Sequence, residues 1–197
     1  MKKEMGWLSS RCICSVLVEL AKKPGTPMDL RVRTHMTKNN YVNIILKRLE
    51  FEGIVKCLNP KEKIGKVFCV EPKNKYRLEK LFKKMKINQK INPLPHLNWN
   101  AYGILFCRSL CRQIRLVFKE AYKLGNERDF ENNRKKRINV PGLQKEKLTK
   151  MATSDVHRAF NRLVELGLMK RKSAWPKEYV FTKDALKIIA FENSIVE

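Results

Sequence analysis

The sequence lacks the motifs by which common enzyme families bind nucleotides or metals or activate a nucleophile. It has no Gly-rich phosphate loop ending in Lys-Ser/Thr, no G-x-S-x-G turn, no H-E-x-x-H pair and no dinucleotide-binding glycine pattern. The three histidines, His35, His96 and His157, have no repeated carboxylate or cysteine partner. We therefore expect a protein that is not an enzyme and that needs no cofactor.

Acidic residues are also scarce. The chain has 19 Asp and Glu against 43 Lys and Arg, a net charge of +24, whereas a magnitude of roughly 2–8 keeps a small domain soluble. DNA, RNA or an anionic membrane would neutralise such a surface. Residues 1–90 carry a net charge of +14 and residues 91–197 one of +10, so both halves are expected to meet the polyanion. Hydrophobic residues make up 43% of the chain, which excludes a disordered basic tail.

Long uninterrupted apolar runs are missing. Arg11 and Glu19 interrupt the first apolar stretch, which no small-residue cleavage site follows, and three arginines interrupt the second, at 99–118. Such charges are costly in lipid. Both stretches predict amphipathic helices of an intracellular protein that is not bound to a membrane, cytoplasmic or associated with the nucleoid when it is on DNA.

Periodicity and turn signals predict one order of elements that occurs twice. In each half, three helices precede a strand, a charged turn, a returning strand and a closing helix. The expected fold class is mainly α with small β-hairpins, that is, α+β. The segment NQKINPLPHLN is the best candidate linker, so we expect an N-terminal domain over 1–87, a linker over 88–98 and a C-terminal domain over 99–197, which begins with a long helix, Trp99–Leu124.

The two halves align without a gap over the third helix and the strand after it, at an offset of 114 residues. Beyond the turn the offset becomes 111, because the second turn is shorter. Matched core positions and turn glycines indicate an internal duplication. The aligned pairs include Val42 with Val156, Leu46 with Phe160, Leu49 with Leu163, Gly53 with Gly167, Ile54 with Leu168, Lys56 with Lys170, Phe68 with Tyr179 and Val70 with Phe181.

The residues of both copies resemble a known family. YVNIILKRLEFEGIVKC at 41–57 with LNPKEKIGKVFCVE after it, and SDVHRAFNRLVELGLMKRK in the second copy, resemble the recognition helix and wing of winged helix-turn-helix transcription regulators abundant in archaea. The likeness covers residues 28–71 and 143–182. It implies two tandem winged helix-turn-helix domains that bind double-stranded DNA through the third helix and the hairpin wing, often as homodimers. The chain departs from the family at His35, where Gly is frequent, and in the length of the helix Trp99–Leu124.

The outward side of each third helix would supply base contacts, because one α-helix fits the major groove. Asn pairs bidentately with adenine and Arg with guanine, so the asparagines of the first copy and Arg158 of the second are candidates; polar filler is the alternative for the asparagines. Cations at the turns would contact phosphates. The predicted DNA-binding residues are Lys38, Asn39, Asn40, Asn43, Lys47, Arg48, Lys61, Lys63 and Lys66 in the first copy, and Ser154, His157, Arg158, Asn161, Arg162, Arg171, Lys172 and Lys177 in the second.

The run Arg134, Lys135, Lys136 and Arg137 is a possible basic arm for the minor groove or the phosphates, with a solvated loop as the alternative. A plasmid- or virus-type replication initiator, an RNA-binding or assembly module and a ligand- or metal-responsive sensor remain alternative functions. RNA is the less expected partner because of the polar Asn and Arg faces.

Six cysteines raise the possibility of a metal or redox role. Cys107 and Cys111 share a helical face but lack the second pair that a structural zinc site needs, so no metal is expected. Cys57 and Cys69 lie on the two strands of the first hairpin and could face each other. A bridge between them is one hypothesis, and buried free thiols that act as small hydrophobes are the other.

Overall fold

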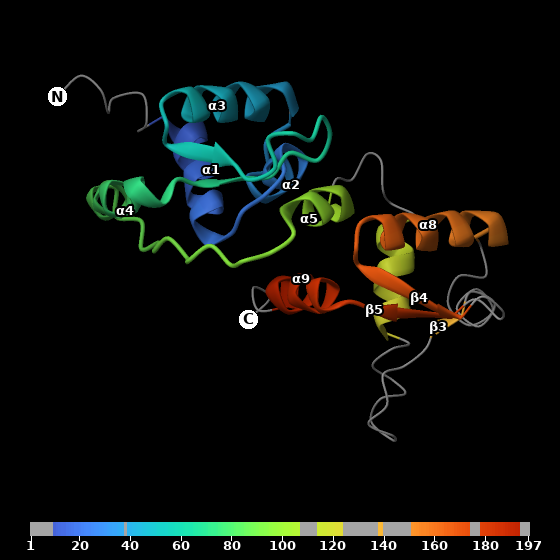
Figure 1. Cartoon of the computed structure of the whole chain (residues 1–197). Helices are drawn as coiled ribbons and strands as arrows, with labels where there is room; N and C mark the ends of the chain where they lie inside the picture. The colour runs from blue at the N-terminus through green and yellow to red at the C-terminus, as the bar shows by residue number, and fades with distance from the viewer. Residues whose placement is uncertain are drawn as a thin grey trace. The chain divides into compact units, whose positions relative to one another are not determined.

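The chain folds into two compact units, Met1–Arg108 and Ser109–Glu197 (Figure 1). It is a mixed α+β protein, predominantly helical, with small antiparallel sheets, as predicted. Among the described residues, no helix has both the length and the hydrophobicity needed to span a bilayer. The computed structural model describes residues 10–37, 39–106, 114–123, 138–139, 151–173 and 178–193.

The first unit consists of three helices, a two-stranded antiparallel hairpin and two further helices. Bridge residue Gly25 adds one antiparallel pairing, with Phe68, on the edge of the hairpin. In chain order the elements are α1 (Arg11–Lys22), α2 (Pro27–Arg33), α3 (Asn39–Phe51), β1 (Val55–Cys57), β2 (Phe68–Val70), the 3₁₀ turn η2 (Pro72–Asn74), α4 (Lys75–Lys84) and α5 (Trp99–Phe106).

Local signals set the ends of the helices. The hydroxyl of Thr26 accepts a hydrogen bond from the Asp29 amide at 3.2 Å, and Pro27 occupies the first position of α2, where its missing N–H is not needed. The turn from α2 to α3 passes through His35 at φ +53°, a left-handed conformation that usually requires glycine. Gly53, at φ +65°, ends α3 in the same conformation.

The core of the first unit lies between α1, α2, α3, α4 and the inner face of the hairpin. Side chains such as Leu17, Leu30, Leu49 and Phe82 are fully buried there. Removing each of them from water contributes roughly 1.5–3 kcal/mol to folding. The apolar periodicity that predicted these helices is therefore satisfied within the unit.

The segment 88–98 is a strap on the first unit and not a linker. Ile91 is buried, and its amide donates to the Glu79 carboxylate at 3.0 Å. The amide of Asn92 donates to the Ala21 carbonyl at 3.0 Å, and its side chain donates to the Lys22 carbonyl at 2.8 Å. The strap lacks periodicity because its backbone is held by groups from α4 and from the end of α1.

The boundary between the units falls within the stretch predicted as the single helix Trp99–Leu124. Helix α5, its first part, belongs to the first unit, and the helical segment 114–123 belongs to the second. In α5, Ala101, Tyr102 and Leu105 are buried. The domain limits predicted at residues 87 and 99 therefore differ from the division at Arg108/Ser109.

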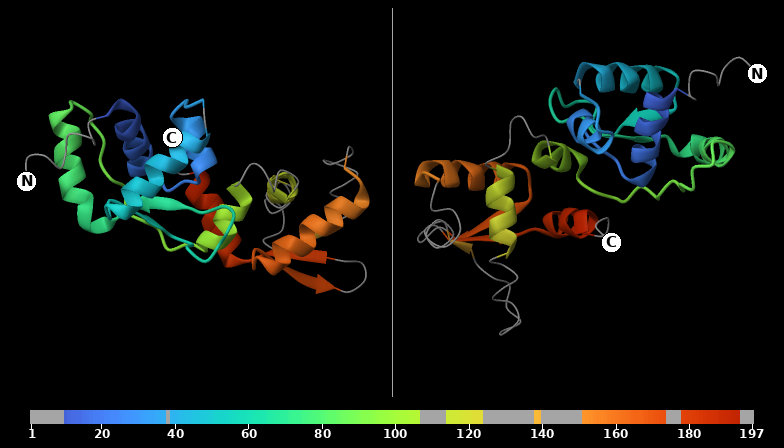
Figure 2. Two further views of the ribbon diagram at one scale, coloured as in Figure 1. Left: turned by 90° about the horizontal axis from the view of Figure 1, so that it is seen from above. Right: turned by 180° about the vertical axis from the view of Figure 1, so that it is seen from behind.

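The second unit repeats the helix–hairpin–helix order. Helical segment 114–123 lies against the sheet (Figure 2). Phe118 and Tyr122 make edge-on contacts with Phe181, with ring centroids 5.5 and 6.3 Å apart. The three strands are all antiparallel, in the order β3-β5-β4. The labelled elements are β3 (Ile138–Asn139), α8 (Thr153–Glu165), β4 (Met169–Ser173), β5 (Glu178–Phe181) and α9 (Lys183–Asn193). The short helix expected near 143–150 lies outside the described residues.

The two units share the strand register that the sequence alignment predicted. Lys56 pairs with Cys69 in the first hairpin and Lys170 with Val180 in the second, which reproduces the offsets of 114 and 111. Gly53 and Gly167 adopt φ values of +65° and +71°. The connections from α3 to β1 and from α8 to β4 have the same hydrogen bond. The Ile54 amide donates to the Leu49 carbonyl at 2.8 Å, and the Leu168 amide donates to the Leu163 carbonyl at 2.9 Å.

Candidate nucleic-acid interface

The third helix of the first unit buries the face that its periodicity predicted. Val42, Ile45, Leu46 and Leu49 are at most 4% exposed. The predicted contact residues Asn43, Lys47 and Arg48 are exposed. Asn39 and Asn40 lie in the first turn of α3, but their side chains, like all of Lys38, are outside the described residues.

A groove of about 320 Å³ runs between α3, the start of α2 and the connection from β1 to β2. It is lined by Asn43 and Lys47 from α3 and by Lys63 and Lys66 from the connection, so four predicted residues from separate segments come together. Glu50 is the acidic residue among those that line it. The groove is therefore basic, with an amide side chain on its helical wall.

The connection from β1 to β2 is held by a side chain that the sequence interpretation missed. Asn59 is 3% exposed. Its side-chain Nδ2 donates to the Gly65 carbonyl at 3.0 Å, and its side-chain Oδ1 accepts from the Val67 amide at 2.7 Å. The Glu62 amide donates to the Asn59 carbonyl at 3.1 Å, which closes a turn over Asn59-Pro60. The Asn-Pro dipeptide is a turn signal that could have revealed this role. Lys61, Lys63 and Lys66 are exposed around this turn.

Helix α5 packs against the connection from β1 to β2. A Cβ placed on Gly103 would overlap the Gly65 carbonyl oxygen, and one on Gly65 would lie 2.6 Å from the Gly103 carbonyl oxygen. Both positions are therefore closed to any side chain. Because these glycines are 38 residues apart in the sequence, no local pattern indicates their contact.

The exposed surface of α3 also has an apolar side that the sequence interpretation did not foresee. Tyr41, Ile44 and Phe51 are 46%, 62% and 90% exposed. They follow a spacing of three and seven residues, which places them along one side of the helix, beside the side that carries Asn43 and Lys47. The predicted DNA-facing surface therefore covers only part of the outer face of α3.

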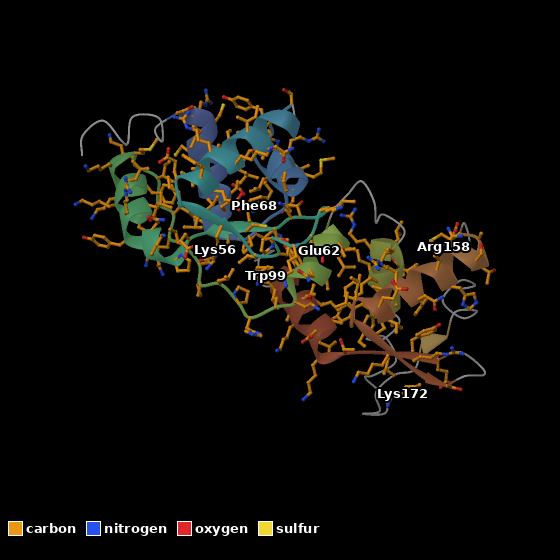
Figure 3. All side chains as sticks on the ribbon, turned by 45° about the horizontal axis from the view of Figure 1, so that its top comes forward. Lys56, Glu62, Phe68, Trp99, Arg158 and Lys172 are labelled. Atoms are coloured by element: carbon orange, nitrogen blue, oxygen red, sulfur yellow. The ribbon has the colours of Figure 1, made fainter. Side chains whose placement is uncertain are left out.

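In the second unit, α8 exposes Ser154, Arg158, Asn161 and Arg162, as expected. Arg158 projects outward from the helix (Figure 3), 3.4 Å from the Asp155 carboxylate. Arg162 donates to Glu165 at 2.7 Å. Ion pairs as exposed as these contribute little to stability, so phosphates or bases can replace the carboxylates at small cost.

His157 does not face outward as predicted. Its side chain is half-buried, and its Nδ1 atom is buried with no hydrogen-bond partner among the residues described. The position follows Val156 on the helix and lies near the edge of the buried face, so its ring is only partly presented to solvent.

The second hairpin exposes Arg171 and Lys172, both on β4 (Figure 3 labels Lys172). Arg171 donates to the Ser173 carbonyl at 3.1 Å, which holds its guanidinium near the strand. Lys177 and the run Arg134, Lys135, Lys136 and Arg137 lie outside the described residues.

The proposed Cys57–Cys69 bridge is wrong. Cys57 lies opposite Phe68 and Cys69 opposite Lys56, so the two thiols are on different faces of the hairpin, and both are free. Burial raises the pKa of the Cys69 thiol to about 11 and also raises the pKa of Cys57. Within the described ranges, no three His, Cys, Asp or Glu side chains cluster as metal ligands would. Cys107 and Cys111 are not among the described residues.

Comparison with protein-family models, with curated proteins and with solved structures gave no match.

Proposed function

We propose that the chain binds double-stranded DNA and regulates transcription, with its two units acting as tandem winged helix-turn-helix domains. Helices α3 and α8 would enter major grooves, and the hairpin cations would contact phosphates. The observation that carries the proposal is the basic groove, in which Asn43 and Lys47 of α3 and Lys63 and Lys66 of the hairpin open onto one space.

Two further observations support this proposal. The turn between α2 and α3 contains a residue in the left-handed conformation, His35, at the place where winged helix-turn-helix regulators often have glycine. The hairpins follow α3 and α8 with equal register. A net charge of +24 spread over both halves also favours an extended polyanion as the partner.

The experiment is an electrophoretic shift assay of the full chain with genomic duplex fragments at low salt, in competition with random duplex and with double-stranded RNA. We expect enrichment of particular duplex sequences and weaker competition by RNA. Failure to shift any duplex would overturn the proposal. Equal competition by RNA would assign the groove to shape-dependent RNA binding.

The apolar side of α3 favours a second candidate function for the first unit, assembly with a protein. Large exposed apolar side chains on one side of a helix, here with Arg48 between Ile44 and Phe51, are more typical of protein contacts than of phosphate contacts. Tyr41, Ile44 and Phe51 would form this contact while Asn43 and Lys47 remain at the groove. Cross-linking of the chain at working concentration, with and without duplex, would show whether such an assembly exists.

A further inference from the structure

Helix α4 carries a concentration of positive charge that the α3 groove does not use. Its ten residues, KYRLEKLFKK, include five cations and one acid. The five cations, Lys75, Arg77, Lys80, Lys83 and Lys84, are all exposed. None of their side chains has an ion pair or hydrogen bond with any residue that the structure describes. The outer face of α4 is thus an uncompensated basic surface about 15 Å long.

The single acid of α4 does not neutralise these cations. Glu79 is half-buried, and its carboxylate accepts the hydrogen bond of the Ile91 amide at 3.0 Å. It is engaged in fixing the strap 88–98 to the helix. The charge of the outer face therefore remains available to a partner.

The other face of α4 is committed to the core. Leu78, Leu81 and Phe82 are at most 7% exposed. With this side buried, α4 has no apolar face to insert among lipid tails, as a membrane-bound amphipathic helix does. Tyr76 is 77% exposed and lies among the cations. Tyrosine side chains are among the groups that hydrogen-bond to phosphate oxygens of DNA.

The second unit shows that the fold does not require this charge. Helix α9 also follows its hairpin and also buries apolar residues at i, i+3 and i+4, which are Ala185, Ile188 and Ile189. Its eleven residues include two Lys, one Asp and one Glu, a net charge of zero. The basic face of α4 is therefore not a requirement of packing a closing helix against its unit.

We infer that the outer face of α4 is a second DNA-binding surface, which holds the phosphate backbone by charge and does not recognise bases. Within the first unit, α4 and the β1–β2 connection lie at opposite ends (Figures 1 and 2), so this surface is separate from the α3 groove. Its length corresponds to roughly four base-pair steps. The inference rests on the proposed function only for the identity of the polyanion.

The test replaces Arg77, Lys80 and Lys84 with glutamine in the full chain. The control replaces three exposed cations of the second unit with glutamine and changes the net charge by the same amount. These residues are Lys119, Lys183 and Lys187. Binding of a random-sequence duplex is measured by fluorescence anisotropy between about 50 and 200 mM salt, with circular dichroism to check folding. Three lost phosphate contacts reduce the slope of log K against log salt by about 2.7, so wild type should lose about 40-fold more affinity over this range than the α4 variant.

The control variant should keep the wild-type slope. Equal slopes for the α4 variant and the control would overturn the inference and leave the proposed function intact. If the α4 variant shows the lower slope while Asn43→Ala and Arg158→Ala leave the ratio of specific to random duplex affinity unchanged, the α4 surface stands and the proposed function falls. Selective binding of phosphatidylserine vesicles over duplex through the same three residues would assign the surface to a membrane and overturn the inference.

Discussion

Helices α3 and α8 share their inner face and differ on their outer one. Inside, both bury apolar residues at equivalent positions, and each is followed by a glycine with positive φ. Outside, one side of α3 is largely apolar, whereas the equivalent side of α8 consists of charged residues of both signs. The equivalent residues on this side are Tyr41 and Asp155, Ile44 and Arg158, Arg48 and Arg162, and Phe51 and Glu165.

The buried positions of α3 and α8 are alike because both must satisfy packing, whereas packing does not constrain the exposed positions in the same way. A side of α8 that carries Arg158 and Arg162 suits a polyanion, while a side of α3 that carries Ile44 and Phe51 suits an apolar partner. The closing helices diverge in the opposite sense, since α4 is strongly basic and α9 is neutral.

The hairpins differ in how they are supported. In the first unit, Asn59 and the Gly65–Gly103 contact hold the connection, and only a bridge at Gly25 extends the sheet. In the second unit, strand β3 pairs with β5 at Ile138 and Asn139. The first hairpin is thus supported by α5, which packs against its connection, and the second by strand β3, which pairs along its edge.

The largest effect is expected from the shared core. Leu49→Ala and Leu163→Ala each remove a fully buried side chain and should each cost about 2–5 kcal/mol of unfolding free energy. If the units fold independently, differential scanning calorimetry will show two transitions, and each substitution will shift only its own. Leu186→Ala, at a half-exposed position, is the control. A single transition that both substitutions lower equally would contradict independent units.

The next effect tests the contact between α5 and the β1–β2 connection. Gly65→Ala and Gly167→Ala both place alanine at φ +71°, so the conformational penalty is the same. Gly65 faces the Gly103 carbonyl, whereas no atom lies within 4 Å of a Cβ at Gly167. Gly65→Ala should therefore destabilise its unit by about 1–3 kcal/mol more than Gly167→Ala, measured by urea denaturation. Equal losses would show that α5 does not brace the hairpin.

Sequence preference should depend on α8 more than on the apolar side of α3. Arg158→Ala is expected to lower the ratio of specific to random duplex affinity by about 1–3 kcal/mol, roughly 5- to 150-fold, because it removes a guanine contact. Ile44→Ala, at the equivalent position of α3, should leave that ratio unchanged. Competition binding on both duplexes measures it. An equal loss on specific and random duplex for Arg158→Ala would contradict base recognition.

The smallest effect concerns the buried thiol of Cys69 in the first hairpin. The pKa of Cys69 is about 11 in the folded chain against 9.0 in the unfolded one, because burial disfavours the thiolate. The unfolded state therefore loses its proton first as the pH rises, and folding stability falls above about pH 9. Val180 occupies the equivalent position, so Cys69→Val is the matched change. Between pH 8 and pH 10 the variant should lose about 1 kcal/mol less unfolding free energy than wild type. Parallel losses would contradict the raised pKa.

Local sequence patterns were sufficient to predict the buried faces and the ends of α3 and α8. The apolar spacing of Val42, Ile45, Leu46 and Leu49 predicted their burial, and the glycine after each third helix predicted its end, because both depend on neighbouring residues alone. The exposure of Asn43, Lys47 and Lys63 followed from the same periodicity and from turn composition.

Contacts between distant segments were decided by the tertiary structure. The sequence by itself determined the duplicated cores, the helix ends and the basic character of both halves. The fold decided that 88–98 is a strap, that the predicted helix at 99–124 is divided between two units, that Tyr76 faces solvent and that Cys57 and Cys69 lie on different faces. The physical reason is that periodicity shows which side of a helix or strand is apolar and must be buried. Packing across the whole unit decides which other element covers that side.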